Sequence, residues 1–362
     1  MSQVSNILKR DMSLFYQDFH EEYKISNNTS DMTLVSDFTE YNPLHNGHFH
    51  CMKTAKHMFN ESLFVAIVPG LFERSGRGIP YILPREKRAE IAISVGADIV
   101  VEGPPMGIMG SGQYSLCLCK MFKALNTDYI PRGYKPVSGM DEILKRINMG
   151  HHIAPKPYKI VDKTTGEIIL KGKLEEDNYV ITSFSNSLSK INFDFTDKFI
   201  FVKRIEGVSG TLIRQSIMDN DFNNVLDMMP QKTIEVLKRE IENNSIIYGI
   251  RNEENILNTA NNYSFKELAN LNLFNDKLAE NIVKNRPYDD LETLEKSILQ
   301  GFSTHFHQRV LSILENPIPK KIISQYIDKY PSVIRILGYK NKEKLEIFKN
   351  KINNENVSLW RE

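Results

Sequence analysis

The chain has 362 residues, of which 41% are hydrophobic, and its 46 Lys and Arg against 45 Asp and Glu give a formal net charge of +1. This length is enough for two domains of ordinary soluble composition, and the near-neutral charge excludes a globally basic nucleic-acid-binding protein, so a nucleic-acid partner would need a local basic patch. The three cysteines are an odd, sparse set and no apolar stretch approaches about 20 residues, which predicts a cytoplasmic protein without a disulfide framework or a membrane span.

The first 31 residues are predicted to be an N-terminal appendage. Their composition is polar and charged, without the apolar region of a secretory signal. Ile7, Met12, Phe15 and Phe19 predict one amphipathic helix, which ends in the loop 26–30. The pattern assigns no function to this segment.

From Met32 onward, short apolar runs alternate with helical patterns. The predicted strands are 32–38, 63–70, 97–104 and 127–133, and the predicted helices are 48–59, 85–95 and 113–126. This alternation predicts an α/β fold over residues 32–235, a Rossmann-like parallel sheet with helices on both faces. Ligands of such sheets bind at the carboxyl ends of the strands.

The later part of the chain contains a predicted hairpin and then a helical region. The turn Asp-Lys-Thr-Thr-Gly at 162–166 lies between two alternating runs, which predicts a β-hairpin, and "DKFIFVKRI" at 197–205 predicts a further strand. After about residue 235 glycine is scarce, and we predict a mainly helical C-terminal domain over 236–362. Its predicted helices are 233–245, 264–272, 275–285, 288–300, 303–315, 318–328 and 342–352.

The stretch His45-Asn46-Gly47-His48 follows the first predicted strand and is expected to open a helix at or near Gly47. A helix N-terminus has free N–H groups and a partial positive charge, which favour a phosphate. Gly47 allows a nucleotide to lie against the backbone, and His45 and His48 are donors to the same phosphates. This arrangement suits the expulsion of pyrophosphate from an α-phosphate, which needs positioning and charge stabilisation rather than a protein nucleophile. The alternative is that one histidine caps the helix and the other packs beneath it.

A second stretch, "GVSGTLIR" at 207–214, opens another predicted helix. Ser209 and Thr211 are favourable N-cap residues, and Arg214 offers a permanently charged planar fork to a triphosphate. Taken alone, this stretch is equally typical of a capped helix with a surface arginine. Together with the upstream histidines, it predicts a second phosphate-binding element.

The two stretches together resemble the nucleotidyltransferase superfamily, with its (H/T)xGH loop and its Ser-Ser-Thr-x-x-Arg-like signature. A wider resemblance, over about residues 33–340, is to the bacterial tRNA(Met) cytidine acetate ligase family. The segments that carry it are "EYNPLHNGHFHCMKTAK", "GIPYILPREKRAEIAISVGADIVVEGP", "DNYVITSFSNSL", "FIFVKRI" and the helical tail beginning "FKELANLNLF".

The resemblance implies a function: the family activates acetate with ATP to acetyl-adenylate and transfers the acetyl group to the wobble cytidine of elongator tRNA(Met). Its ATP-binding first block corresponds to residues 38–51, and its later glycine, asparagine and arginine correspond to Gly133, Asn178 and Arg204. With the two stretches above, the predicted nucleotide-binding residues are Phe38, Thr39, Glu40, Tyr41, Asn42, Pro43, Asn46, Gly47, Gly133, Asn178, Arg204, Ser209 and Thr211, and the predicted catalytic residues are His45, His48 and Arg214.

The expected cofactor of the triphosphate is Mg²⁺. Asp37 and Glu40 flank the histidine motif, and either carboxylate is a candidate to orient the ion. Alternatively, both carboxylates cap or solvate the loop. No dedicated set of metal ligands is predicted.

The chain departs from the family pattern mainly in segments expected near the acceptor of the acyl group. Arg132-Gly133-Tyr134-Lys135 stands where the family has Phe-Gly-Ser-Glu, and the loop 69–80 is longer by about two residues. A basic cluster follows at 74–88. Within it, Arg77 and Arg88 align with family arginines and are the predicted tRNA contacts, unless the cluster is a solvated loop and helix face.

Two other functions remain open from the sequence. One is a small-molecule nucleotidyltransferase that transfers an adenylyl or cytidylyl group in cofactor synthesis, against which the helical C-terminal region counts. The other is a nucleotide- or RNA-binding protein without transfer activity, which the altered loop and Lys135 keep open. The sequence identifies neither the acid nor the oligomeric state.

Overall fold

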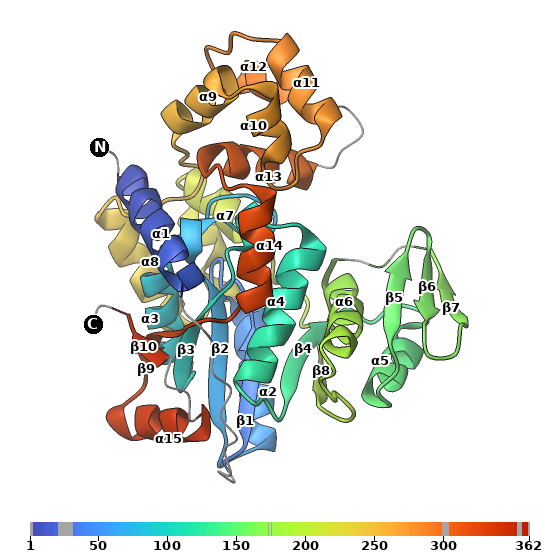
Figure 1. The fold of residues 1–362 in the computed structure, drawn as a ribbon. Helices are drawn as coiled ribbons and strands as arrows, with labels where there is room; N and C mark the ends of the chain where they lie inside the picture. Colours follow the sequence, from blue (N-terminus) through green and yellow to red (C-terminus); the bar gives the residue numbers. More distant parts are fainter. Residues whose placement is uncertain are drawn as a thin grey trace.

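A computed structural model of the chain describes residues 3–20, 32–172, 174, 176–298, 304–352 and 357–360. Its centre is a five-stranded sheet in the order β1-β2-β3-β9-β10, in which β1, β2 and β3 are parallel and β9 is antiparallel to β3 (Figure 1). The strands are β1 (Leu34–Phe38), β2 (Leu63–Pro69), β3 (Ile99–Gly103), β9 (Ile334–Tyr339) and β10 (Val357–Leu359). The predicted α/β class with a parallel sheet is therefore confirmed.

A second pair of parallel strands, β4 (Ile130–Tyr134) and β8 (Phe199–Lys203), continues the sheet beyond β1. The connection is a parallel bridge between Val35 and Tyr129, with a hydrogen bond from the Ser36 N–H to the Tyr129 carbonyl at 2.9 Å. The carboxyl ends of β1, β4 and β8 thus lie side by side.

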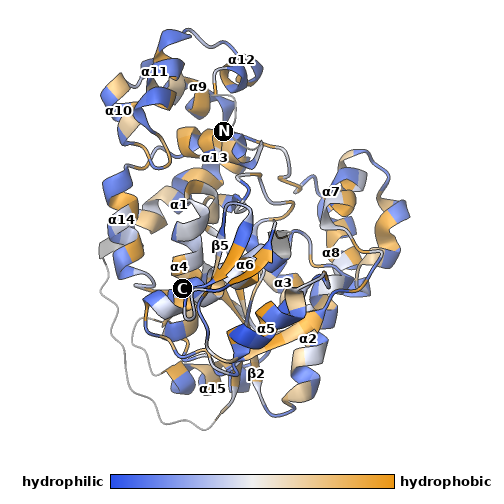
Figure 2. Cartoon of the chain, turned by 90° about the vertical axis from the view of Figure 1, so that its right-hand side faces the viewer, coloured by the Kyte–Doolittle hydropathy of each residue, from blue (hydrophilic) through white to orange (hydrophobic). Residues whose placement is uncertain are grey.

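Alternate residues of the buried strands belong to two separate cores, one on each face of the sheet. On β2, Leu63, Val65 and Ile67 belong to the larger core, whereas Phe64, Ala66 and Val68 belong to the smaller one. Helices on both faces bury these residues, and Figure 2 shows such helices striped with hydrophobic and hydrophilic residues. The helices of the smaller core are α2 (Asn46–Met58), α3 (Arg85–Val95), α7 (Gly210–Met218) and α8 (Gln231–Glu242); those of the larger core include α1 (Gln3–His20), α4 (Ser111–Ala124), α6 (Glu176–Lys190) and α14 (Lys320–Lys329).

The predicted hairpin is confirmed, and it forms part of a small antiparallel sheet. The strands β6 (Lys159–Asp162) and β7 (Ile168–Lys171) pair across the turn, and β5 (Ile153–Lys156) pairs with β6. This sheet packs against α6 and α5 (Met140–Asn148). The helix α5 was not predicted from the sequence.

A lobe of helices stands above the sheet at the top of Figure 1. It contains α9 (Glu253–Asn262), α10 (Phe265–Asn270), α11 (Asp276–Lys284), α12 (Leu291–Lys296) and α13 (Thr304–Glu315). Each predicted helical segment overlaps a helix of the described residues, and α9 is an additional helix. The segment 342–352 has its predicted bounds, α8 begins two residues earlier than predicted, and α14 ends one residue later. Short 3₁₀ turns lie at η1 (Leu71–Glu73), η2 (Met106–Ile108) and η3 (Phe222–Met228). None of the described helices is long and apolar enough to cross a membrane.

The N-terminal helix and the last strands both pack with the α/β core. From the sequence, we expected an N-terminal appendage and a helical C-terminal domain beside that core. The predicted N-terminal helix exists, but its Phe15 is fully buried and stacks on Tyr326 of α14 with 4.7 Å between ring centroids. After α14 the chain returns to the sheet as β9, α15 (Lys342–Ile352) and β10. The strands β9 and β10 were not predicted from the sequence. The boundaries at 31/32 and 235/236 stay predictions, and the predicted loop 26–30 lies outside the described residues.

Candidate active site

A cavity of about 480 Å³ opens at the carboxyl ends of β1 and β4, beside the first turns of α2 and α7. Its wall also includes the loop 75–79, which follows η1. The lining residues are Asp37, Phe38, Thr39, Glu40, Asn42, His45, Gly47, His48, Cys51, Ser75, Gly76, Arg77, Ile79, Met106, Tyr114, Arg132, Gly133, Val180, Arg204, Val208, Ser209, Gly210, Thr211 and Arg214. The cavity therefore unites the two stretches that the sequence singled out.

The two histidines of the first stretch are stacked. The centroids of the His45 and His48 rings are 3.8 Å apart and their planes differ by 12°. His45 is the N-cap residue of α2, and Gly47 lies directly beneath its ring, because a Cβ there would meet His45 Cε1 at 3.0 Å. The His45 Nδ1 atom is buried and has no hydrogen-bond partner among the described residues. The first turn of α2 thus carries an unsatisfied polar atom in the cavity wall.

Both imidazoles are held neutral by their surroundings. Burial lowers the pKa of His45 to about 4, and the charge of Arg204 contributes to this shift. Burial is the main cause that lowers the pKa of His48 well below its usual value, and the electrostatic effect of the neighbouring His45 is the second cause. At neutral pH both rings are therefore hydrogen-bonding groups rather than cations.

The helix α7 brings the second stretch against the first. Ser209 caps α7, since its hydroxyl accepts a hydrogen bond from the Leu212 N–H at 3.2 Å. A Cβ on Gly210 would meet the His45 ring at 3.4 Å, so the start of α7 lies against that histidine. Arg214 Nη1 donates to the Asn42 carbonyl at 2.6 Å, which ties α7 to the loop before α2. Two helix N-termini and their partial positive charges consequently face one cavity.

Arginines outnumber carboxylates in the cavity wall. The arginines are Arg77, Arg132, Arg204 and Arg214, and the carboxylates are Asp37 and Glu40. Burial raises the pKa of Asp37 to about 7 against the opposing effect of Arg132, and desolvation also raises the pKa of Glu40. The cavity is thus net positive and suited to a polyanion.

Most of the residues predicted from the sequence line this cavity. The predicted residues found there are Phe38, Thr39, Glu40, Asn42, His45, Gly47, His48, Arg77, Gly133, Arg204, Ser209, Thr211 and Arg214. They come from the ends of β1, β4 and β8, from the starts of α2 and α7, and from the loop 75–79, which are far apart in the chain. The structure thereby brings them together, while their roles stay predictions.

Four predicted nucleotide-binding residues do not line the cavity. Tyr41 is fully buried and its ring meets His48 edge-on, with 5.4 Å between centroids. Pro43 is buried, and the Asn46 amide donates to the Asp227 carbonyl at 2.7 Å, toward η3. Asn178 is fully buried, and its amide exchanges hydrogen bonds with the Lys135 backbone at 3.0 and 2.9 Å. These four residues support the walls rather than face the cavity.

Arg88, a predicted tRNA contact, has a structural position instead. It is fully buried, its guanidinium donates to the carbonyls of Leu83 and Pro69, and it pairs with Glu73 at 2.9 Å. Because no part of the side chain reaches the surface, the expectation that it contacts RNA is wrong in this structure. Arg77, the other predicted contact, does line the cavity.

Sequence reasoning missed several residues of the wall. Arg132 was noted only as a departure from the family pattern, although its place at the end of a buried strand was a signal that it faces the site. Tyr114 and Met106 come from the connection between β3 and α4, and no local pattern marked them. Across the described residues there is no group of three or more His, Cys, Asp or Glu side chains arranged to hold a metal ion.

Comparison with known proteins gives consistent matches along the chain. The model of the HIGH nucleotidyl transferase family matches residues 32–130, and that of the cytidyltransferase-related C-terminal region matches residues 135–338. An uncharacterized protein of Methanocaldococcus jannaschii is 47% identical over 92% of this chain and 93% of its own length. A Thermotoga maritima protein named tRNA(Met) cytidine acetate ligase is 25% identical over 89% of this chain and 86% of its own length.

A Clostridium perfringens protein of the same name is 24% identical over 91% of this chain and 89% of its own length. Among solved structures, Thermotoga maritima TmcAL bound with alpha-thio ATP has a TM-score of 0.73 at 18% identity. That match covers 91% of this chain and 85% of the other. At this identity the structural match shows a common fold.

Proposed function

The chain belongs to the HIGH nucleotidyl transferases that carry a cytidyltransferase-related C-terminal region, and we propose that it is an ATP-dependent ligase. In this proposal the cavity binds ATP and a small carboxylic acid, acetate by analogy with the relatives named tRNA(Met) cytidine acetate ligase. The acid becomes an acyl-adenylate with release of pyrophosphate. The acyl group then passes to the wobble cytidine of elongator tRNA(Met).

The observation that carries the proposal is the convergence of two helix N-termini and a stacked histidine pair in one arginine-rich cavity. The N-termini of α2 and α7 offer backbone N–H groups to phosphate oxygens. His45 and Arg214 line the same cavity, where His45 Nδ1 and the guanidinium of Arg214 add side-chain donors. The ATP analogue in the structurally similar Thermotoga protein also supports ATP as the nucleotide.

In this mechanism the chain's own residues position the reactants and stabilise charge. The neutral rings of His45 and His48 donate hydrogen bonds to the phosphate oxygens on which negative charge develops. Arg214, held by Asn42, contributes a fixed positive charge to the leaving pyrophosphate. Cys51 is not a nucleophile here, because burial raises the pKa of its thiol far above neutrality. Direct attack of the acid on the α-phosphorus therefore fits the site.

Mg²⁺ belongs to the proposal as the partner of the triphosphate. Glu40 and Asp37 are the carboxylates in the wall, and each already holds one partner: the Gly76 N–H at 2.8 Å and Arg132 at 3.2 Å. These two carboxylates would hold the ion beside the triphosphate, since Mg²⁺ prefers oxygen ligands. The ion would neutralise part of the triphosphate charge.

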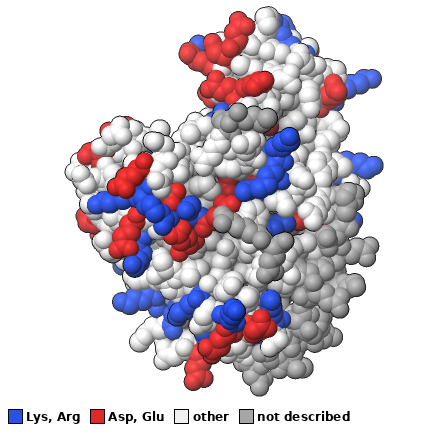
Figure 3. All heavy atoms as spheres, turned by 90° about the vertical axis from the view of Figure 1, so that its left-hand side faces the viewer, with Lys and Arg blue, Asp and Glu red and all other residues white. Residues whose placement is uncertain are grey.

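The proposed tRNA site is the mouth of the cavity beside the helical lobe. The helix α13 contacts the loop 75–79 of the cavity wall. Arg309 donates to the Gly76 carbonyl at 3.0 Å, and the Ser312 hydroxyl donates to the Gly78 carbonyl at 2.8 Å. An RNA bound to the lobe would therefore place a nucleotide near Arg77. On the face in Figure 3, Lys and Arg are interspersed with Asp and Glu rather than gathered in a broad basic patch. In this proposal the affinity for RNA would rest on local contacts such as Arg77.

The test is ATP–pyrophosphate exchange by the purified full-length chain with Mg²⁺ and a panel of short carboxylic acids, with and without total tRNA. Exchange that requires an acid, followed by transfer of labelled acyl groups to tRNA, supports the proposal. Pyrophosphate release that requires a phosphorylated small molecule instead would identify a cofactor-type nucleotidyltransferase. ATP binding without release under every condition would identify a nucleotide-binding protein.

A further inference from the structure

Arg132 occupies a position that the proposed ATP site does not use. It lies on β4, at the carboxyl end of the sheet, and its side chain is 14% exposed, toward the cavity. The guanidinium lies near two aromatic rings, 5.4 Å from the centroid of Phe184 and 5.8 Å from that of Phe38. These rings limit its movement and leave it little contact with water.

One edge of this guanidinium is engaged and the other contains an unsatisfied donor. Arg132 Nη1 pairs with the Asp37 carboxylate at 3.2 Å and donates to the Phe38 carbonyl. Arg132 Nε is buried and has no hydrogen-bond partner among the described residues. A buried donor without an acceptor is energetically costly, so such an atom in a cavity wall indicates a ligand that supplies the acceptor.

The charges on either side of the cavity differ. Arg204 and Arg214 lower the pKa of both histidines, and Arg132, which pairs with Asp37, adds to this effect at His48. The Asp37 carboxyl group pairs with Arg132, and the adjoining wall is formed by Phe38 and Val180. The Nε edge of the guanidinium, beside apolar side chains, suits the two oxygens of one small carboxylate rather than a triphosphate, which needs many donors.

We propose that Arg132 binds the carboxylate of the acid that this site activates. The inference rests on the proposed function and assigns the acid to the wall formed by Arg132, Phe38 and Val180. The Nε–H group holds one carboxylate oxygen, and a lone pair of the other oxygen attacks as the nucleophile. That oxygen forms a bond to the α-phosphorus, the bond from the α-phosphorus to the bridging oxygen breaks, and pyrophosphate leaves with the electron pair. The products are the acyl-adenylate and pyrophosphate, with no oxidant or further reactant.

The first measurement separates the acid from ATP. In Arg132→Gln, the KM for acetate in ATP–pyrophosphate exchange is expected to rise about tenfold or more, while the KM for ATP changes less than about twofold. Arg132→Lys keeps a positive charge and is expected to recover part of the loss. An unchanged KM for acetate in Arg132→Gln, or an equal rise in both KM values, would overturn the proposal.

A matched variant excludes a simple structural effect. Removal of Arg132 alone leaves Asp37 as a buried carboxylate without its partner, whereas Asp37→Asn/Arg132→Gln removes both charges. The double variant is expected to unfold at a higher urea concentration than Arg132→Gln and, with ATP and Mg²⁺ saturating, to show the same rise in the KM for acetate. If the double variant regains the acetate KM of the unmodified protein, the effect of Arg132 is structural and the proposal is wrong.

A direct binding measurement keeps this inference distinct from the proposed function. The ¹⁵N–¹H signal of Arg132 Nε, identified by its loss in Arg132→Lys, is expected to move downfield as acetate is added, and to stay in place with the neutral acetamide. A shift with acetate in a protein that shows no exchange would support the acid site and refute the ligase reaction. Exchange without any shift would support the ligase reaction and refute the role of Arg132.

Discussion

The carboxylate of Asp11 on α1 accepts a hydrogen bond from the backbone N–H of Phe72 at 2.8 Å. Phe72 has a φ of +67°, a backbone conformation that a side chain other than glycine rarely adopts, and it begins the turn that leads to the cavity loop. The same Asp11 carboxylate pairs with both terminal nitrogens of Arg85, at 2.7 and 2.8 Å. An N-terminal helix therefore holds a strained turn next to the site.

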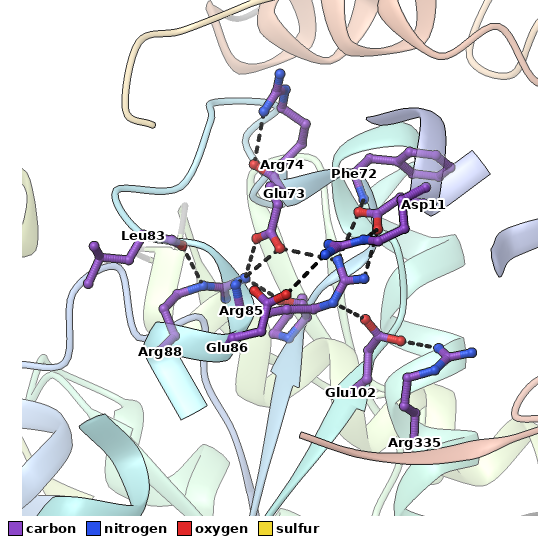
Figure 4. Close-up of polar contacts among 12 residues, drawn as sticks. Asp11, Phe72, Glu73, Arg74, Leu83, Arg85, Glu86, Arg88, Glu102 and Arg335 are labelled. Carbon is purple, nitrogen blue, oxygen red and sulfur yellow. Dashed lines mark hydrogen bonds and ion pairs between the residues drawn. The ribbon is translucent and has the colours of Figure 1, made fainter. Parts of the chain in front are cut away.

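The contacts of Arg85 extend this connection into a buried ion network, shown in Figure 4. Arg85 also pairs with Glu73 at 3.1 Å and with Glu102 at 2.8 Å, and Glu102 pairs with Arg335 on β9. All five side chains are at least nine-tenths buried. The network thus joins the N-terminal helix, the turn before the cavity, and the strand near the C-terminus.

Loss of the Asp11 charge is expected to destabilise the fold strongly. Asp11→Asn leaves Arg85 with an incomplete set of buried partners, and breaking a buried ion pair in this way costs about 3–5 kcal/mol. Urea unfolding followed by circular dichroism measures the change. The control is Glu346→Gln, since Glu346 and Lys349 pair at 3.6 Å with side chains 65% and 39% exposed, and an exposed pair contributes about 0–1 kcal/mol. Equal losses in the two variants would contradict this account of the network.

Two glycines at equivalent helix positions provide a matched pair of variants. Gly47 is the second residue of α2 and Gly112 is the second residue of α4. Alanine at 47 would place its Cβ 3.0 Å from the His45 ring, whereas a Cβ at 112 meets no atom within 4 Å. We expect Gly47→Ala to reduce pyrophosphate exchange at least tenfold by displacing His45. Gly112→Ala is expected to raise stability by up to about 1 kcal/mol without a change in activity. Full activity of Gly47→Ala would show that the position of the His45 ring is unimportant.

His48→Ala is expected to remove most of the pyrophosphate release while the chain stays folded. Loss of one hydrogen-bond donor to a developing negative charge typically reduces the rate by about 10²–10³-fold. His57→Gln is the control, because His57 lies on the same helix and is exposed, outside the cavity. Melting curves verify that both variants fold. An active His48→Ala protein would remove the catalytic role of this histidine.

Proton NMR of the histidine rings tests the electrostatics of the cavity. The pKa of His45 is expected near 4, and Arg204→Gln is expected to raise it, because a nearby positive charge disfavours the imidazolium form. Comparison with the spectrum of His45→Gln assigns the signal. Since the folded pKa lies below the ordinary value of 6.5, the contribution of His45 to stability is present above about pH 6.5 and is lost as pH falls toward 4. Titration of His45 near 6.5 would contradict its burial against Arg204.

The location and local geometry of the candidate site follow from short-range patterns in the chain. Apolar runs with helical segments between them determine the parallel strands, and a parallel sheet binds ligands at the carboxyl ends of its strands. His45 and Gly47 lie at such an end, and Ser209 caps a helix for reasons of local hydrogen bonding alone. For these residues, neighbours within a few positions are sufficient to predict the conformation.

The environment of each long polar side chain depends instead on residues that are remote in the chain. Arg77 and Arg88 belong to one basic segment, yet only Arg77 reaches the cavity, because Arg88 is buried against Glu73 and carbonyl groups. The partner of Arg85 is Asp11, 74 residues away, in a segment that the sequence presented as an appendage. The periodicity of a strand or helix gives the direction of a side chain but not the partner it meets. Whether a charged group is buried is decided only when separate elements pack together. Such packing gives Arg88 a structural role and leaves the Nε of Arg132 without an acceptor among the described residues.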